Sequence, residues 1–173
     1  MTARDRSLVI EVADLRRRPG SHLDFHTTVA ATDVRMGDVG VADGAPVDVA
    51  VGIESLSDGL VATGTVRAHW SGACRRCLEP AEGDMVVDVE ELFRPSASPD
   101  DEAFPIVDDQ VDLRPVVTEV LVCALPLAPL CRDDCQGLCA ECGSNRNLID
   151  CGHDGRPADP RWSALEALRD QLN

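Results

Sequence analysis

Eight cysteines, most of them in close pairs, constrain this chain more than any other feature of its sequence. Three pairs are separated by two or three residues, and in a fourth pair the partner of cysteine is histidine. The pairs are Cys74 with Cys77, Cys131 with Cys135, Cys139 with Cys142, and Cys151 with His153. Such spacings let the backbone turn so that both side chains reach one ion at about 2.3 Å. The sequence therefore predicts four half-sites, which make two complete tetrahedral metal sites.

Spacing leaves two ways of joining the half-sites. The loop Gly143–Asp150 is short, which favours a local site and leaves the remaining cysteines for a second ion. In this pairing, which we favour, the sites are Cys74/Cys77/Cys131/Cys135 and Cys139/Cys142/Cys151/His153. In the competing pairing, they are Cys131/Cys135/Cys139/Cys142 and Cys74/Cys77/Cys151/His153.

The ligand set favours zinc in structural sites. Histidine beside thiolates is more typical of Zn than of an iron–sulfur cluster, although thiolates suit both. Four protein ligands leave no open coordination position for a substrate. The alternatives are free cysteines in a core and a thioredoxin-like Cys74–Cys77 pair, which would need a βαβ context that the sequence lacks. Cys123 is left over and is predicted to be a small buried hydrophobic residue.

Composition excludes several classes of function. The 173 residues are 44% hydrophobic, enough for a core, but the formal net charge is -15 and aromatic residues are 3%. This charge disfavours a general electrostatic grip on DNA, RNA or an anionic membrane. The longest apolar run, Val120–Leu130, is broken by two prolines and is too short for a membrane span. No apolar secretory segment is visible, so we expect a cytoplasmic protein without a disulfide framework.

Hydrophobic alternation predicts an antiparallel β region followed by helices. Residues 47–53 and 61–67 alternate around a turn at Ser57–Gly59 and predict a hairpin, and Met85–Val89 predicts another strand. Residues 93–110 are rich in acid and proline and predict a mobile loop. Asp112 can begin a helix that Pro126 ends, and Asp159–Pro160 predicts a second helix.

The expected class is therefore α+β: an antiparallel β meander or partly open barrel with a C-terminal helical, cysteine-rich zinc-binding region. We expect an antiparallel β region over 1–94, which includes the first zinc knuckle, the turn from Cys74 to Cys77. An acidic mobile loop should follow over 95–111. A helix, the zinc-binding cysteine cluster and a C-terminal helix should occupy 112–173. The first and last parts should form one compact unit. The sequence contains no H-E-x-x-H, G-x-S-x-G or phosphate-binding glycine loop, so no enzyme and no small-molecule substrate are predicted.

These motifs together resemble the YceD family of large ribosomal RNA subunit accumulation proteins. The resemblance covers roughly residues 47–153. Its first part rests on Cys74, Arg76, Cys77, Leu78 and Pro80, and its second on Asp112, Leu113, Glu119, Leu121, Leu125, Pro126, Pro129, Leu130 and Cys131. Its last part rests on Asp134, Cys135, Gly137, Leu138, Cys139, Cys142, Gly143, Asn145 and Asn147. Shorter relatives lack the later cluster, which supports the favoured pairing.

The resemblance implies a non-enzymatic bacterial factor for the processing or accumulation of 23S ribosomal RNA. Its expected partners are a large-subunit precursor, and within it a basic ribosomal protein or ribosomal RNA; the acidic composition favours the protein. Arg75 and Arg76 lie between two predicted ligands, where they either contact RNA or a partner, or screen the thiolates. The alternative function is a redox-responsive zinc protein that regulates a partner through metal release.

Overall fold

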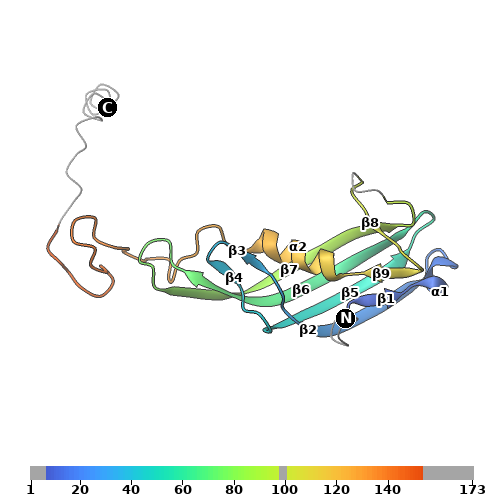
Figure 1. Cartoon of the computed structure of the whole chain (residues 1–173), viewed down its shortest axis with the longest axis horizontal. Helices are drawn as coiled ribbons and strands as arrows, with labels where there is room; N and C mark the ends of the chain where they lie inside the picture. Colours follow the sequence, from blue (N-terminus) through green and yellow to red (C-terminus); the bar gives the residue numbers. More distant parts are fainter. Residues whose placement is uncertain (1–6, 98–100, 154–173) are drawn as a thin grey trace, which may run out of the picture.

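The computed structural model describes residues 7–97 and 101–153, which form nine strands and two helices (Figure 1). The strands are β1 (Val9–Glu11), β2 (His22–Ala30), β3 (Arg35–Met36), β4 (Val39–Val41), β5 (Pro46–Ser55), β6 (Leu60–Ala73), β7 (Pro80–Arg94), β8 (Phe104–Pro105) and β9 (Gln110–Asp112). The helices are α1 (Ala13–Arg16) and α2 (Arg114–Ala124). Within these ranges no helix is long and apolar enough to cross a membrane.

The strands form one large open sheet and one small one. The seven-stranded sheet has the order β2-β5-β6-β4-β3, with β7 on the other edge of β6 and β8 beside β7. Strands β1 and β9 make the two-stranded sheet. All pairs are antiparallel except β7 with β8. The predicted α+β class with an open antiparallel sheet is confirmed.

The β6–β7 hairpin is the longest feature of the fold. Its register runs without interruption from Leu60 opposite Phe93 to Ala73 opposite Pro80. Strand β5 pairs with β6 only as far as Arg67, and the short β4 takes over that edge at Trp70 and Ser71. The far end of the hairpin therefore leaves the body of the sheet as an arm, at the left of Figure 1.

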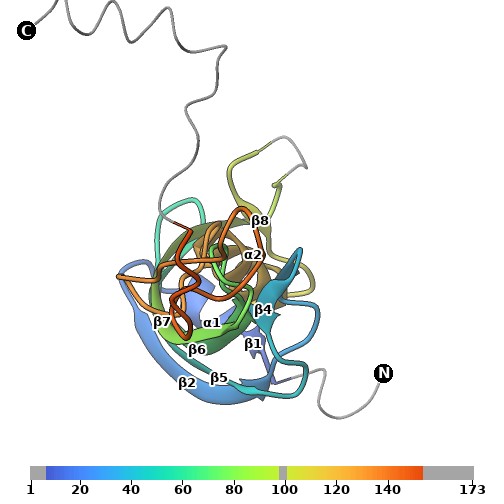
Figure 2. The same ribbon diagram turned by 90° about the vertical axis from the view of Figure 1, so that its left-hand side faces the viewer.

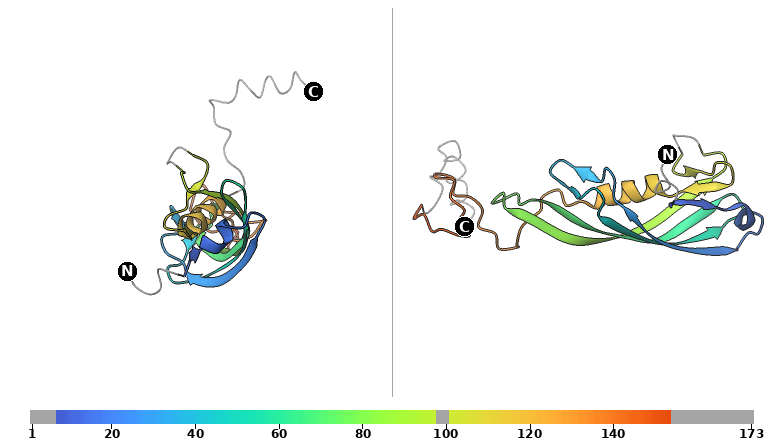
Figure 3. Two further views of the ribbon diagram at one scale, coloured as in Figure 1. Left: turned by 90° about the vertical axis from the view of Figure 1, so that its right-hand side faces the viewer. Right: turned by 60° about the horizontal axis from the view of Figure 1, so that its bottom comes forward.

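The main core lies between the large sheet and helix α2, which occupies the concave side of the sheet (Figure 3). Alternate residues of β5 are buried, as the sequence pattern predicts. The helix buries Val116, Val117 and Leu121 against β6 and β7. The N-cap position is Leu113, whose side chain makes no capping hydrogen bond, and Asp112, one residue earlier, accepts at Oδ1 a hydrogen bond from the backbone N–H of Arg114 at 2.9 Å. The helix ends where Leu125 turns extended, because it precedes a proline.

Two details differ from the sequence-based expectations. Cys123 is exposed instead of buried, because it lies two residues after Leu121 and so about 200° away from the buried stripe of the helix. The acidic segment 95–111 is not entirely loop, since it includes β8 and the start of β9. Its apolar residues explain this: Ile106 is buried, and the Phe104 ring packs on Phe93 with centroids 5.6 Å apart. The predicted C-terminal helix lies outside the described residues.

Replacing Leu121 with alanine should lower the free energy of unfolding by about 2–5 kcal/mol, because a fully buried side chain leaves a cavity between helix and sheet. Denaturant unfolding of the metal-loaded protein measures this. The matched control is Cys123→Ala on the exposed side of the same helix, which should change stability by less than about 0.5 kcal/mol. Equal effects of the two substitutions would show that α2 does not pack as described.

Candidate metal centres

Four cysteines from two distant parts of the chain meet at the tip of the β6–β7 arm. In this first cluster (Cys74, Cys77, Cys131, Cys135) all four sulfurs lie within 4.8 Å of one another. Cys74 Sγ is 3.8 Å from Cys135 Sγ, and Cys77 Sγ is 3.5 Å from Cys131 Sγ. Three of the residues are buried and Cys131 is exposed. Trp70, Ala81 and Leu130 pack around them and form a second small core.

Backbone hydrogen bonds hold the two halves of the first cluster together. The turn after Cys74 is closed by a hydrogen bond from the backbone N–H of Cys74 to Glu79 O at 2.8 Å. Leu78, within this turn, has φ +65°. Arg75 N–H then donates to Pro129 O at 2.9 Å, and Leu138 N–H donates to the carbonyl of the next residue, Arg76, at 3.0 Å. These bonds hold the Cys74–Cys77 turn between Pro129, which precedes Cys131, and Leu138, which follows Cys135.

A glycine makes this close approach feasible. Gly137 has φ +72°, a conformation that residues with a side chain rarely adopt. A Cβ at this position would also lie 3.0 Å from the carbonyl oxygen of Arg76. Gly137 lies two residues after Cys135 and two before Cys139, so the turn at this glycine connects the last ligand of the first cluster to the first ligand of the second.

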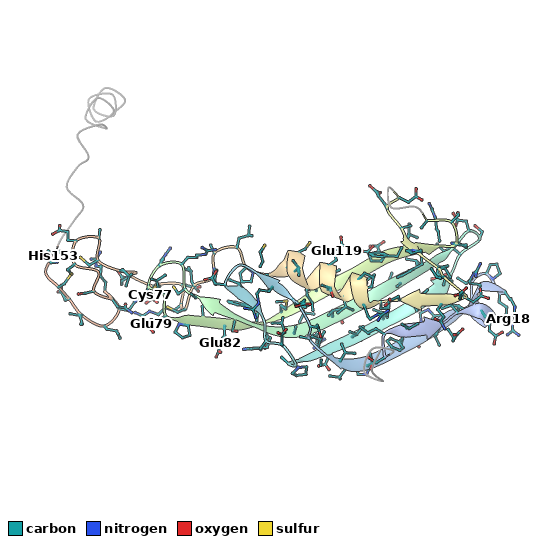
Figure 4. The ribbon with its side chains drawn as sticks, viewed as in Figure 1. Arg18, Cys77, Glu79, Glu82, Glu119 and His153 are labelled. Carbon is teal, nitrogen blue, oxygen red and sulfur yellow. The ribbon has the colours of Figure 1, made fainter. Side chains whose placement is uncertain are left out.

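The second cluster (Cys139, Cys142, Cys151, His153) is built locally and is more open. Its ligand atoms also lie within 4.8 Å of one another, with Cys139 Sγ 3.7 Å from His153 Nδ1. His153 Nε2 is 3.6 Å from a carboxylate oxygen of Glu141, which suits a ring that ligates through Nδ1 and donates its other N–H. Gly143 has φ +73°, as expected for the tight turn after Cys142. Figure 4 shows His153 beyond Cys77, at the end of the arm.

Thiol acidity differs sharply within the first cluster. Burial raises the pKa of Cys74, but the backbone N–H groups of Cys131 and Arg76 and further hydrogen bonds outweigh it and lower that pKa to about 6. Cys131 is exposed as a residue, yet its sulfur faces the other three, and desolvation with these neighbours raises its pKa to about 12. One thiolate thus forms readily and the accumulation of charge opposes the next, unless a cation neutralises them.

A serine lowers the pKa of one thiol in the second cluster. Hydrogen bonds from the hydroxyl and then the backbone N–H of Ser144 lower the pKa of Cys142 to about 6. Ser144 Oγ lies 3.3 Å from Cys142 Sγ. A nucleophilic thiolate is therefore available on an exposed residue of this cluster.

The donor sets fit a tetrahedral ion. Metal–sulfur bonds of about 2.3 Å place the sulfurs of a tetrahedron about 3.8 Å apart, which is close to the two distances in the first cluster. All eight cysteines are free. The groups that meet are those of the favoured pairing, Cys74/Cys77/Cys131/Cys135 and Cys139/Cys142/Cys151/His153, and the competing pairing is not observed.

The two arginines between Cys74 and Cys77 have different environments. Arg76 turns towards the cluster, where its Nη1 donates to Cys135 O at 3.0 Å and approaches Asp133 O at 3.5 Å. Arg75 is 55% exposed, and its nearest carboxylate, on Asp38, is 3.9 Å away. Arg76 therefore holds the backbone at Cys135, whereas the Arg75 guanidinium lies at the surface near Asp38.

Several residues around the clusters make contacts that the sequence does not predict. Asn147 Nδ2 donates to Cys135 Sγ at 3.3 Å, and Asn145, Ser144 and Glu141 make the contacts described here and below. The two asparagines belong to the residues that carry the family resemblance, but their spacing suggests no ligand. To predict that they lie near the first cluster, one would have to know how the chain folds back.

The fold and clusters define a class of protein: an open antiparallel sheet that carries two thiol-rich, metal-type centres at the tip of a long hairpin (Figure 2, where the orange cysteine-rich segment faces the viewer). The sequence model of the family described as large ribosomal RNA subunit accumulation protein YceD matches residues 62–169, which include all eight candidate ligands. The chain belongs to the YceD family. The description of the family implies a role in the accumulation of the large ribosomal RNA subunit and names no reaction.

Relatives extend the similarity towards the N-terminus. An uncharacterized protein of Mycobacterium tuberculosis is 36% identical over 165 residues, which cover 91% of this chain and 79% of the relative. An uncharacterized protein of Mycobacterium leprae is 33% identical over the same length, with 91% and 76% covered. No solved structure matches the chain.

The purified chain should carry two zinc ions, because each cluster supplies four ligands. Native mass spectrometry measures the number of ions. Cys77→Ser with Cys135→Ser should remove one ion, and Cys142→Ser with Cys151→Ser should remove the other. Cys123→Ser is the matched control and should keep both, since Cys123 lies on the helix. A metal-free chain with disulfides would contradict the assignment.

Metal binding to the first cluster should release protons. At neutral pH Cys74 is already a thiolate, whereas Cys131, with a pKa of about 12, must lose its proton to ligate. The apparent affinity should therefore fall as the pH is lowered, by about tenfold per pH unit for each proton released. Calorimetric titrations of zinc in buffers of different ionisation enthalpy count these protons. Affinity independent of pH would show that these thiols are not the ligands.

Proposed function

We propose that this protein is a non-enzymatic assembly factor that supports the processing or accumulation of 23S ribosomal RNA in the large ribosomal subunit. The observation that carries the proposal is the family match over the arm and both clusters. In this proposal the two clusters bind zinc as structural sites. Four protein ligands at each centre leave no position at which zinc would activate a substrate. Free thiols throughout the chain suit a reducing cytoplasm.

The charge of the sheet supports a basic protein as the direct partner. On the convex face, opposite helix α2, carboxylates of β5 and β7 occupy strand positions that alternate with less exposed ones, and Asp24 of β2 lies opposite Gly52 on the same face. They are Asp24, Asp48, Glu54, Glu82, Asp84, Asp88 and Glu90, and all are exposed. Arg67 lies among them, next to Asp48 and Val86 on the neighbouring strands. Such a face repels a phosphate backbone and attracts the basic segments typical of ribosomal proteins.

In this proposal, contact with RNA belongs at the arm tip. Arg75 is exposed there, but carboxylates of Asp133, Asp134 and Glu79 surround the same tip. Thiolate–zinc centres would add further negative charge. A broad phosphate-binding surface is therefore disfavoured, and Arg75 would make a local contact only.

The open second cluster favours one alternative function, a redox-responsive regulator. Cys142 is exposed and its pKa is lowered to about 6, so it is a reactive thiolate in the metal-free site. A peroxide could oxidise two site thiolates to one disulfide, with the peroxide reduced to water and the zinc ion released. In this alternative, metal release changes the affinity for a partner.

The native protein should sediment with large-subunit precursors in sucrose gradients of growing cells, and crosslinking should identify a basic ribosomal protein beside it. Asp88→Lys with Glu90→Lys should weaken the association by at least about tenfold, because a face that attracts basic segments loses two carboxylates and gains two cations. The matched control is Glu102→Lys with Glu119→Lys, the same charge change in one hollow beside helix α2, on which Figure 4 labels Glu119. This control should leave sedimentation unchanged.

Other outcomes separate the remaining proposals. Loss of sedimentation in Arg75→Glu alone, with the sheet variant intact, would make RNA at the arm tip the contact. Arg76 is not suited to this test, because its guanidinium braces Cys135. Protein found only at the top of the gradient would contradict the assembly role and favour the redox alternative.

A further inference from the structure

Asn147 connects the two clusters in an unexpected way. In the sequence it lies between Cys142 and Cys151, two members of the second cluster. In space its side chain reaches the first cluster, where Nδ2 donates to Cys135 Sγ at 3.3 Å. A loop that the second cluster closes therefore supplies a hydrogen-bond donor to a predicted ligand of the first.

The orientation of this amide is fixed by its other partners. Asn147 Oδ1 accepts hydrogen bonds from the backbone N–H of Gln136 at 2.7 Å and from Arg132 Nη2 at 2.8 Å. Both partners can only donate, so the oxygen must face them and the nitrogen must face the sulfur. Nδ2 also donates to Asn145 Oδ1 at 2.8 Å, which uses its second proton.

The position of Asn147 depends on how its loop lies against the second cluster. Cys139 N–H donates to Ser144 O at 2.8 Å, and Arg146 N–H donates to Gly137 O at 2.9 Å. Residues 144–147 thus run beside 137–139, the stretch that joins the two clusters. An ion shared by Cys142 and Cys151 would tie both ends of this loop and hold Asn147 in place.

We propose that Asn147 couples the two metal sites, so that an ion in the second cluster increases the affinity of the first, and the reverse. An N–H donor aimed at a thiolate stabilises the ligated, charged form of Cys135, and such outer partners tune metal affinity. An ion in the second cluster positions the donor in advance. Because coupling free energies are reciprocal, both sites gain by the same factor. This inference rests on the proposed binding of metal by both clusters.

The test is a set of four cobalt(II) titrations against a competing chelator. The proteins are the wild type, Asn147→Ala, a second-cluster knockout (Cys142→Ser with Cys151→Ser), and the knockout combined with Asn147→Ala. The visible absorption of cobalt distinguishes a four-thiolate site from one with three thiolates and an imidazole. Asn147→Ala should weaken the first site by about 10- to 100-fold. The knockout should weaken it about 5-fold or more with Asn147 present and leave it unchanged with alanine there.

Two further variants separate the donor from general loop damage. Asn147→Asp keeps acceptor oxygens for Gln136 and Arg132 but replaces the donor with a negative charge, so the first site should weaken at least as much as with alanine. Gln136→Ala is the matched control, because its side-chain amide donates to Asp134 O and its backbone N–H, which donates to Asn147, is kept in the variant. It should leave the affinity of the first site unchanged.

Failure of the coupling and failure of metal binding give different results. A wild-type chain that binds no cobalt or zinc contradicts the proposed zinc sites. Two ions that bind with first-site affinity unaffected by the second-cluster knockout overturn the coupling, whatever the alanine variant does. An equal effect of the knockout in the Asn147 and alanine backgrounds shows coupling that does not pass through this residue, and overturns the assignment to Asn147.

Discussion

The continuous antiparallel ladder of β6 and β7 is the constraint on which the rest of this molecule depends. At one end it places Leu60 and Phe93 in the main core, and at the other it delivers Cys74 and Cys77 to the arm tip. A slip of one residue would turn every core side chain outward and would also displace the cysteine turn. Burial in the body of the sheet thereby determines where the first cluster forms, although the cluster itself lies beyond the body.

The arm tip needs something other than apolar burial to hold it. Few strands flank β6 and β7 there, and the second small core contains little besides Trp70, Ala81 and Leu130 around the sulfurs. Four thiols brought this close resist ionisation together, as the contrast between Cys74 and Cys131 shows. A divalent cation bound by the four sulfurs would resolve that repulsion and would at the same time crosslink the hairpin to the segment after helix α2. The four thiolates that suit a metal ion are therefore also the groups through which the arm tip would be held to the segment after helix α2.

Sequence reasoning succeeded where one pattern dominates. Alternation over residues 47–67 predicts the β5–β6 hairpin, and ligand spacing predicts both half-site pairs of each cluster. It failed where several weak signals compete. Cys123 sits in an apolar run, and only its angular position on α2 shows that it is exposed. Phe104 and Ile106 are embedded in acidic sequence, so their packing on the sheet edge was missed. The role of Asn147 requires a tertiary contact that no local pattern contains.

The two clusters also differ in how their ligands can assemble. The second gathers residues within a short stretch, Cys139–His153, so closing it orders only a small loop. The first joins Cys77 to Cys131 across the whole of β7, β8, β9 and α2, so closing it brings together distant parts of the chain at a larger entropic cost. Closing the local cluster first would arrange residues 137–147 before Cys135 reaches the hairpin turn. The chain therefore places the cluster that closes locally beside the one that depends on long-range packing, so a loop ordered early would lie next to the ligands that assemble late.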